Sequence, residues 1–403
     1  MEPVVIERAA EALRARRRDL VAAYGLAGLQ GRVVSAIGDA ADLWADPAYA
    51  GRTKARAASA SFPYEMVDVS LRGLLPSLAS SRLLALIAAE DPDLSRSPEL
   101  IGHVLASNTP LLGWTTVLRA LLVGSASLVK LPSSAEAVWL ALLVESLSDV
   151  APELAGLVDT LVWRGGDDRF DKVFAESTDR LVVYGSDETL RAYSELCEST
   201  KRVGYGHRVS LGIVLRGADY AKAARGFAID ILTYDQGGCL SPHTILVDGD
   251  HAAACDFGDA LAGALASCDL PALAPRTGPR RSARVREARQ LARFEANARV
   301  WEADDLRWTV IGVSERKFRF SPTHGVVYLV PFAFRELPRI LEPVSSLLQG
   351  AGIAACRKTD EREISVVLSR YGVSYTCCPG ALQAPPFEWR EDGRDLLNTL
   401  LKM

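Results

Sequence analysis

The sequence predicts an α/β protein built on parallel sheets, with a helical region at its N-terminus. Three observations support this class. The first hundred residues carry apolar side chains at helical spacing. From His103 onward, short apolar runs alternate with helical segments, which is the pattern of parallel strands covered by helices. The chain has 403 residues, which is too many for one ordinary core and predicts two domains.

The composition narrows the functional classes. Hydrophobic residues make up 49% of the chain and charged residues 24%, as in globular proteins. The net charge of -4 gives no general attraction to nucleic acid. Seven cysteines in no zinc-like spacing favour free thiols in a reducing cytosol. The longest apolar run, 111–128, contains Arg119 and predicts a buried helix and strand. We therefore expect no metal site, no nucleic-acid partner and no membrane span.

The first half is predicted to be helical and then alternating. The strand at 103–106 begins the alternation of strands and helices. Before it, Pro76 should divide the segment 66–89 into two helices, because proline is tolerated only in a first helical turn. Ser186 is a predicted helix N-cap. The predicted helices are 7–24, 32–44, 66–89, 111–122, 135–146, 172–177 and 188–195, and the predicted strands are 103–106, 127–131, 157–163 and 180–184.

The second half continues the alternation around a central loop. An arginine-rich stretch after residue 275 ends in an exposed helix, and it is either a solvated face or a phosphate-binding patch. We expect a first domain at 1–208, completed by the tail near 376–403, and a second domain at 209–375. The predicted strands are 209–215, 244–247, 308–313, 326–330, 364–369 and 373–375, and the predicted helices are 219–233, 252–266 and 336–349.

The central loop, residues 235–243, reads Asp-Gln-Gly-Gly-Cys-Leu-Ser-Pro-His. Its glycines permit a tight connection between a helix and a strand. Such a turn can expose both the thiol of Cys239 and its backbone N–H to a cleft. A thiolate is a strong nucleophile, and a neighbouring N–H can hold a developing oxyanion. On this stretch alone, a small buried thiol is the alternative interpretation.

Further motifs occur in order with this loop. They are Ala106-Ser107-Asn108-Thr109-Pro110, Ser127-Leu128-Val129-Lys130-Leu131-Pro132-Ser133, Tyr184-Gly185-Ser186 and Gly206-His207-Arg208-Val209-Ser210, followed by a tail motif at 385–394. Together they resemble the aldehyde dehydrogenase superfamily and, within it, the acyl-CoA reductases of the bacterial bioluminescence (LuxC) type, over residues 60–403. The resemblance implies two Rossmann-like domains, one for the cofactor and one carrying Cys239, although the usual G-x-G-x-x-G fingerprint is absent.

The resemblance also implies catalytic roles. Cys239 would be the nucleophile, and the side-chain amide of Asn108 would form the oxyanion hole together with the Cys239 N–H. A turn-forming asparagine before Pro110 is the alternative for Asn108. His243 and His207 are candidates for lowering the pKa of the thiol, although histidines are more often structural hydrogen-bonding residues.

On the cofactor side, the resemblance implies that Lys130 holds the adenosine ribose and that Gly185 and Ser186 face the pyrophosphate. A strand-end lysine reaching solvent and a plain N-cap are the alternatives. Ser133-Ser134 stand where NAD-preferring relatives carry a glutamate, which favours NADPH and leaves NADH open. The family motif that holds the nicotinamide ribose is not visible, and residues 319–322 are a candidate replacement. The remaining candidate cofactor residues are Ser133, Arg164 and Thr109.

The type of reaction is predicted from one position where this chain departs from the pattern of the superfamily. Hydrolytic relatives carry a glutamate base where this chain reads Gly-Tyr-Gly-His-Arg at 204–208, with no carboxylate. Water should then attack a thioacyl enzyme slowly, which favours NAD(P)H-dependent reduction of an acyl thioester to an aldehyde. The thioester carrier is coenzyme A or an acyl-carrier protein. NAD(P)-dependent aldehyde oxidation and a non-catalytic scaffold are the alternatives. We also expect a homo-oligomer in the cytoplasm.

Overall fold

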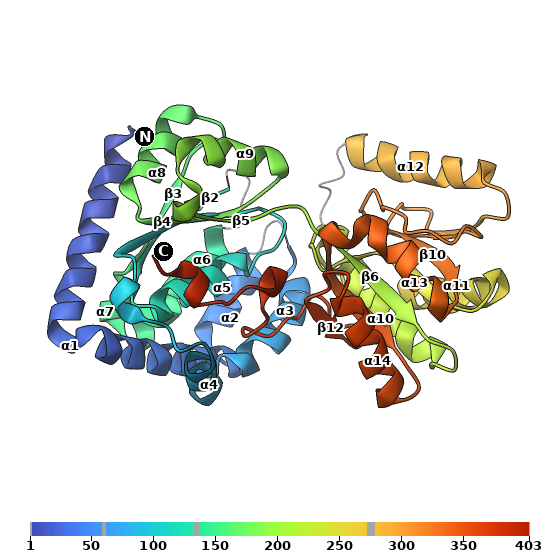
Figure 1. Cartoon of the computed structure of the whole chain (residues 1–403), viewed down its shortest axis with the longest axis horizontal. Coiled ribbons are helices and arrows are strands. Elements are labelled where there is room, and N and C mark those ends of the chain that lie inside the picture. Colours follow the sequence, from blue (N-terminus) through green and yellow to red (C-terminus); the bar gives the residue numbers. More distant parts are fainter. Residues whose placement is uncertain (1, 59–61, 133–136, 272–278, 403) are drawn as a thin grey trace.

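The chain forms two α/β halves that are joined by the β5–β6 connection and by the C-terminal tail (Figure 1). The computed structural model describes residues 2–58, 62–132, 137–271 and 279–402. One half holds a five-stranded sheet and the other a seven-stranded sheet. The predicted α/β class with a helical N-terminal region is confirmed.

The N-terminal region is helical. Its first element, α1 (Val4–Ala45), merges the two predicted helices across a bend at Gly25, whose φ of 68° is left-handed. The helices α2 (Ala50–Ala58), α3 (Tyr64–Ser77) and α4 (Ser80–Glu90) follow, and α3 and α4 meet at 68°. The predicted division near Pro76 is confirmed, but Pro76 lies in the last turn of α3 and not in a first turn.

By length and apolar composition alone, α1 is sufficient to cross a membrane. In the structure, 33% of its most apolar window is buried. Its buried side chains, among them Ile6, Leu29 and Trp44, belong to the core of the first half.

The first sheet is entirely parallel, with strand order β3-β2-β1-β4-β5. The central strand β1 pairs with β2 and β4, so Gly102 lies between Leu128 and Leu181. This order places the switch point of the sheet between β1 and β4, where parallel sheets bind ligands. The elements are β1 (Leu100–Val104), α5 (Leu112–Leu122), β2 (Ala126–Leu131), α6 (Ala137–Val150), α7 (Pro152–Ala155), β3 (Val158–Val162), α8 (Asp168–Ser177), β4 (Arg180–Tyr184), α9 (Asp187–Leu196) and β5 (Arg202–Tyr205).

The second sheet has the order β12-β11-β6-β7-β10-β9-β8, and its edge strand β8 is antiparallel. The elements are β6 (Val209–Val214), α10 (Tyr220–Leu232), β7 (Pro242–Asp248), α11 (His251–Ala266), α12 (Pro279–Phe294), β8 (Arg299–Glu302), β9 (Thr309–Gly312), β10 (Val326–Phe332), α13 (Leu337–Leu341), β11 (Leu348–Ala354), α14 (Lys358–Ser369) and β12 (Tyr375–Cys377).

Several predicted elements were wrong. The predicted strand 364–369 is part of α14, because Ile364 and Leu368, four residues apart, are buried while Val366 is 58% exposed. The predicted helix 336–349 ends early, and β11 begins at Leu348. The sequence prediction missed β5, β8 and β11, which are short or rich in glycine and therefore weak strand signals.

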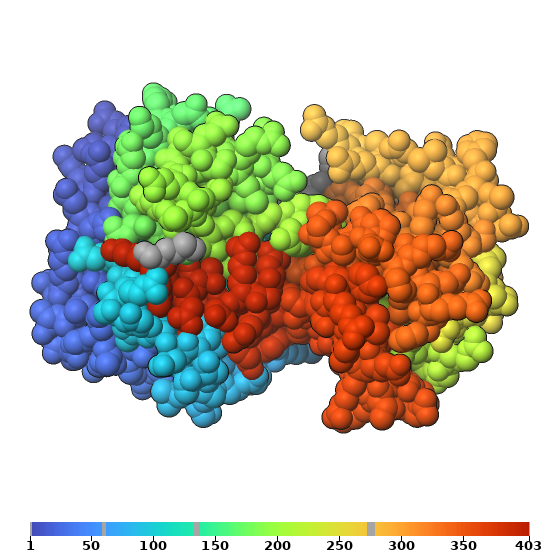
Figure 2. Space-filling model, viewed as in Figure 1, coloured from blue at the N-terminus to red at the C-terminus, as the bar shows by residue number. Residues whose placement is uncertain are grey.

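The C-terminal tail returns to the first half. It leaves the second sheet at β12, and Phe387, Leu396, Leu397, Leu400 and Leu401 join the core around the first sheet. The Glu90 carboxylate at the end of α4 accepts the N–H groups of Leu396 and Leu397 at 2.8 Å each. In the space-filling view the red tail spans the junction between the halves, below an open notch (Figure 2).

Candidate active site around Cys239

Cys239 follows a strained turn. Between α10 and β7, the short 3₁₀ segment Thr233–Gln236 contains three consecutive non-glycine residues in left-handed conformation, with φ of 58° at Tyr234, 53° at Asp235 and 59° at Gln236. Each such residue costs on the order of 1 kcal/mol or more, so the surrounding structure must hold the turn.

Two of the three side chains are held by buried hydrogen bonds. The Tyr234 hydroxyl lies 2.7 Å from the Ser70 hydroxyl on α3. The Gln236 amide Nε2 donates to the carbonyls of Pro242 and Val326, at 2.8 Å each. These contacts tie the turn to the N-terminal helices, to β7 and to β10.

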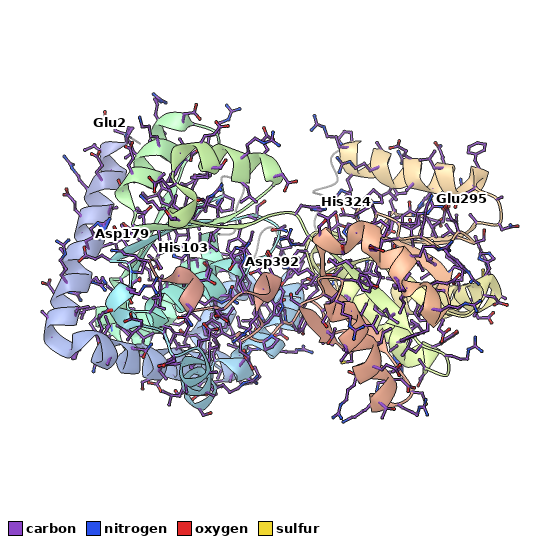
Figure 3. All side chains as sticks on the ribbon, viewed as in Figure 1. Glu2, His103, Asp179, Glu295, His324 and Asp392 are labelled. Atoms are coloured by element: carbon purple, nitrogen blue, oxygen red, sulfur yellow. The ribbon has the colours of Figure 1, made fainter. Side chains whose placement is uncertain are left out.

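The third side chain, Asp235, is held by an ionic clamp. Arg281 of α12 binds its carboxylate through two N–H groups at 3.0 and 2.7 Å, and His324 Nδ1 lies 2.8 Å from it. Burial opposes ionisation of Asp235, but the bonds from His324 and Arg281 outweigh it and lower its pKa. His324 lies at the edge of the second half that faces the first (Figure 3).

Because Arg281 belongs to this clamp, the arginine-rich stretch is only partly the solvated face that the sequence predicted. Arg281 and Arg289 point inward, and Arg289 binds the Thr309 hydroxyl at 2.9 Å. Arg280, Arg284, Arg286 and Arg293 are exposed. Arg276 lies outside the described residues.

Gly238 allows the tail to reach the loop. A Cβ at this position would lie 2.7 Å from Gln383 Oε1. The Gln383 amide donates to the Ser241 hydroxyl at 3.1 Å. The glycine before the cysteine is therefore needed for the approach of the tail, a reason that the sequence did not reveal.

The Cys239 side chain is half-buried. The backbone carbonyl of Cys239 accepts a hydrogen bond from the Ser210 hydroxyl at 2.9 Å. Burial raises the pKa of the thiol, and the carboxylates of Glu391 and Asp392 raise it further. The backbone N–H groups of Cys239 and Leu240 oppose this shift. At neutral pH the thiol is therefore largely protonated.

Asn108 lies on the loop between β1 and α5, directly against the Cys239 loop. Its Nδ2 donates to the Gly237 carbonyl at 2.9 Å. The amide carries a second N–H. The structure thus brings together Asn108 and the nucleophile loop, although the two are 131 residues apart in the chain (239 − 108).

The two candidate histidines are arranged differently. His243 on β7 is 5% exposed, and its Nδ1 accepts the Ser321 N–H at 3.1 Å. Burial, with a smaller effect of His207, lowers the pKa of His243 to about 4. The ring is therefore neutral at physiological pH and carries its proton on Nε2. His207 is exposed. This geometry favours a structural role for His243.

Two carboxyl groups near Cys239 were missed by the sequence prediction. Residues 204–208 contain no carboxylate, as noted, but the tail brings Glu391 and Asp392 to the same place. Arg208 binds Asp392 through two N–H groups at 2.8 and 2.9 Å, and the Tyr184 hydroxyl donates to Glu391 at 3.1 Å. Asp392 lies at the edge of the first half that faces the second (Figure 3). The tail motif at 385–394 was the available signal.

A pocket with a cavity volume of about 110 Å³ opens onto Cys239. It is formed by α3, the start of α5, the nucleophile loop and the tail. Its lining is mainly apolar, with a few polar groups, and comprises Ser70, Leu74, Thr109, Leu111, Leu112, Thr115, Arg119, Tyr234, Cys239, Leu240, Gln383, Pro385, Pro386, Trp389 and Glu391. Thr109, a candidate cofactor residue, lines this pocket.

Lys130 lies at the carboxyl end of β2, one strand from the switch point. Its Nζ lies 5.1 Å from the centre of the Trp163 ring, and burial lowers its pKa. Among the described residues it forms no hydrogen bond or ion pair. A buried ammonium at this edge of a 3-2-1-4-5 sheet fits a dinucleotide hydroxyl. Arg164, after β3, is exposed.

The turn after β4 carries Gly185 and Ser186. A Cβ on Gly185 would lie 2.7 Å from the Thr189 side chain, so this glycine serves close packing. The Ser186 hydroxyl accepts the Thr189 N–H at 3.3 Å, which confirms the predicted N-cap. The first turn of α9 fits an anion, but Asp187 and Glu188 there reduce its positive potential.

Three remaining expectations concern other parts of the chain. Ser133 lies outside the described residues. In the candidate replacement motif 319–322, Ser321 binds His243 and Val326, Arg319 binds Glu295, and Phe320 is 49% exposed. All seven cysteines are free, and the described residues contain no group of three or more potential metal ligands.

The fold is that of the aldehyde dehydrogenases. The chain superposes on a glyceraldehyde-3-phosphate dehydrogenase from Methanocaldococcus jannaschii, solved with NADP, with a TM-score of 0.68 over 99% of this chain and 93% of that one, at 13% identity. An NAD⁺ complex of an aldehyde dehydrogenase from Bacillus cereus gives 0.69 over 100% and 88%, at 15% identity.

Within this class, the family can be named. Residues 93–403 match the family model of the acyl-CoA reductases (LuxC), and the chain belongs to that family. It is 32% identical over 152 residues to long-chain acyl-protein thioester reductase 2 of Photobacterium leiognathi, and 29% identical over 153 residues to the corresponding reductase of Aliivibrio fischeri. Each match spans 37% of this chain and 32% of the relative.

Proposed function

We propose that this protein reduces an acyl thioester to an aldehyde through a thioacyl intermediate on Cys239. The observation that carries the proposal is the hydrogen bond from Asn108 to the loop that carries Cys239, because Cys239 itself lines an apolar pocket. The family membership and the names of the relatives support the same reaction. Coenzyme A or an acyl-carrier protein would deliver the acyl group.

The chain's residues would act in sequence. Cys239 first loses its thiol proton to solvent, and the resulting thiolate attacks the thioester carbon. The oxyanion is held by the Cys239 N–H and the Asn108 amide. The carbonyl re-forms as the carrier thiolate departs and takes up a proton, leaving the acyl group on Cys239. A nicotinamide dinucleotide, when bound, would supply the hydride for the thioacyl carbon. The resulting thiohemiacetal then loses the cysteine as thiolate and releases the aldehyde.

The dinucleotide would lie against the carboxyl edge of the first sheet. Lys130 would bind its ribose hydroxyls, and the first turn of α9 would approach the pyrophosphate. We propose NADPH as the preferred form, on the basis of the Ser133-Ser134 sequence, which offers hydroxyls to a 2′-phosphate.

Replacing Cys239 tests the proposal directly. We expect Cys239→Ala to abolish aldehyde release and to leave the affinity for NADPH unchanged. The measurements are NADPH oxidation with a panel of acyl-CoA substrates, and a fluorescence titration with NADPH. Cys255→Ala, on α11, is the matched control and should retain activity. Normal turnover by Cys239→Ala would refute the assignment.

The reactivity of Cys239 should depend strongly on pH. Because its pKa is raised, we expect the rate of alkylation by iodoacetamide to keep rising above the ordinary thiol range, without a plateau near neutral pH. Glu391→Gln removes one source of the shift and should increase the rate at neutral pH. An alkylation plateau below pH 7 in the unmodified protein would contradict this expectation.

A second candidate function, aldehyde oxidation to acid, is favoured by one observation. Glu391 lines the pocket with Cys239, and burial raises its pKa, as is typical of a carboxyl that acts as a general base near neutral pH. An acid product from an aldehyde and NADP⁺ without added thiol, lost in Glu391→Gln, would support this reaction. Aldehyde release from acyl thioesters would favour reduction.

A further inference from the structure

The part of the tail that packs on the nucleophile loop is held by a buried carboxylate on α10. Asp230 is fully buried and lies nine residues before Cys239 in the chain (239 − 230). Its Oδ2 accepts the Gly380 N–H at 2.7 Å, and its Oδ1 accepts the Leu382 N–H at 3.0 Å. The backbone N–H of Gln383 is a third donor to the same carboxylate. Asp230 thus joins the helix that enters the nucleophile loop to the tail.

The backbones of α10 and the tail approach each other closely around this carboxylate. A Cβ on Gly226, one helical turn before Asp230, would collide with the Pro379 carbonyl. Gly380 has a φ of 94°, which residues with a side chain rarely adopt. These two glycines let the tail come close enough to α10 to donate its N–H groups to Asp230.

Gln383 connects the anchored tail to the nucleophile loop. Its side-chain amide donates to the hydroxyl of Ser241, two residues after Cys239, at 3.1 Å. Gln383 also lines the same pocket as Cys239. The backbone at 380–383 carries this side chain, so the hold of Asp230 on the backbone fixes the position from which Gln383 binds the loop.

Asp230 has no cation to balance its charge, because it forms no ion pair with any residue that the structure describes. Burial raises the pKa of Asp230 to about 7, and the three N–H groups oppose this shift. Its titratable neighbours are Tyr375 and Cys377 of β12, which stay protonated at neutral pH because burial raises the pKa of each and the Asp230 charge adds to the effect. Other charged or titratable residues around α10 are exposed or bonded elsewhere: Lys222, Arg225, Asp235, Asp256, Asp259 and Cys378.

The charge on Asp230 has a cost and a benefit. A buried carboxylate without a cation is unfavourable for folding. The ionised form accepts hydrogen bonds through both oxygens, and these bonds are stronger than those of the protonated form, which also carries a proton that needs an acceptor. The ionised side chain therefore lowers the stability of the fold but holds the tail more firmly, a combination that is typical of groups that serve a functional site.

We propose that the ionised side chain of Asp230 is a positioning residue for Cys239. It fixes the tail at 380–383, and through Gln383 the tail holds the nucleophile loop in its reactive arrangement. This inference rests on the proposed function, because it concerns the same nucleophile. Asp230 itself touches neither the substrate nor the cofactor in this scheme.

Alkylation of Cys239 tests this role without turnover. The rate with iodoacetamide would be measured by mass spectrometry of the Cys239 peptide, for the unmodified protein and for Asp230→Asn, from about pH 5.5 to about pH 8.5, on both sides of the Asp230 pKa. The ratio of the two rates removes the ionisation of the thiol, because the carboxylates that raise the thiol pKa are Glu391 and Asp392.

The ratio of the unmodified protein to Asp230→Asn should depend on pH. We expect it to be near one at the acidic end, where a protonated Asp230 resembles asparagine. It should rise to about tenfold at the basic end, the effect of one hydrogen bond to a charged group. A ratio that does not change with pH would overturn the proposal.

Unfolding measurements separate positioning from a purely structural role. Because the pKa of Asp230 is raised in the folded protein, its ionisation opposes folding, and this penalty develops as pH rises from the unfolded-state pKa through the folded-state pKa. In urea unfolding, the stability of the unmodified protein relative to Asp230→Asn should therefore fall with pH, while its relative alkylation rate rises. If both quantities rose together with pH, the effect would be structural and the proposal would be overturned.

A matched control lies at the other end of the same helix. The exposed Asp219 caps α10 by accepting the Lys222 N–H at 2.9 Å. Asparagine caps helices about as well as aspartate, so Asp219→Asn should alkylate at the unmodified rate at every pH. The same pH-dependent ratio in Asp219→Asn would show a general effect of α10 and overturn the assignment to Asp230.

A second variant tests the route through the tail. Gln383→Met keeps the length of the side chain and removes the bond to Ser241, so adding Asp230→Asn should cause little further loss of alkylation rate. Independent losses in the double variant would overturn the route through Gln383. If Asp230→Asn does not fold, the ratio of the unmodified protein to Gln383→Met decides: it should rise over the same pH range, and a constant ratio would overturn the proposal.

The outcome is distinguishable from a failure of the proposed function. Alkylation needs neither a thioester nor a dinucleotide. If the alkylation ratio rises with pH as expected but no acyl-CoA gives an aldehyde, the positioning role of Asp230 stands and the proposed reaction fails alone.

Discussion

The nucleophile loop and the carboxyl edge of the first sheet are held in different ways. At the loop, Tyr234 binds Ser70, Asp235 binds Arg281 and His324, and each contact joins residues at least 46 positions apart. At the edge, the Ser186 hydroxyl binds Thr189, three residues away. The loop is therefore fixed by contacts with distant parts of the chain, whereas the turn that begins α9 is fixed by a local contact. Changes at the loop should affect both stability and turnover, and changes at the edge should affect cofactor affinity or one helix.

The largest effect is expected at the clamp. Asp235→Ala leaves Arg281 and His324 without their partner and releases a strained turn, so we expect a loss of about 3 kcal/mol in the free energy of unfolding and a large fall in kcat. Urea unfolding and steady-state kinetics measure the two effects. Because the pKa of Asp235 is lowered in the folded protein, its contribution is present above the unfolded-state pKa. The difference from the variant should shrink as pH falls through the lowered pKa.

A surface pair provides the control for the clamp. Arg357 binds Asp360 through the same two kinds of N–H group, at 3.0 and 2.9 Å, but the arginine side chain is 74% exposed. Asp360→Ala should cost less than about 1 kcal/mol, as exposed pairs do. If the two variants lost the same free energy of unfolding, the clamp would stabilise the nucleophile loop no more than an exposed ion pair does.

An intermediate effect is expected at Lys130. If this buried ammonium binds the dinucleotide, Lys130→Met should raise the dissociation constant for NADPH about tenfold, as the loss of one charge-assisted hydrogen bond does. The free energy of unfolding should change little, in contrast to Asp235→Ala. Fluorescence titration measures the affinity, with Lys172→Met on α8 as the exposed control. Unchanged affinity would break the assignment of this edge to the cofactor.

The smallest effect is expected at the N-cap of α9. Ser186→Ala removes the hydroxyl that accepts the Thr189 N–H, which should destabilise the helix by about 1 kcal/mol. Faster hydrogen exchange of the amides in the first turn of α9 would report it. Ser194→Ala, within the same helix, should leave these amides unchanged. A loss of turnover in Ser186→Ala with unaltered exchange would indicate a direct role at the cofactor.

The sequence was sufficient to predict those elements that have strong local patterns. The apolar strand 180–184 and the loop around Cys239 were predicted because alternation and glycine pairs are local signals. The clamp was not predictable, since nothing near Asp235 in the chain indicates Arg281 or His324. The same holds for Glu391, which reaches Cys239 only through the path of the tail. The arginine-rich stretch was misinterpreted in part because helical spacing cannot show which arginine meets a buried carboxylate.

The contact between Glu90 and the backbone at 396–398 has a consequence for biosynthesis. Two of these partners, Leu396 and Leu397, lie 306 and 307 residues after Glu90 in the chain, so the core of the first half stays incomplete until residues 396–397 have left the ribosome. The second sheet, at 209–377, is made before that closing segment. Nascent chains should therefore complete the later-encoded sheet first, and the earlier-encoded half would depend on chaperones for longer.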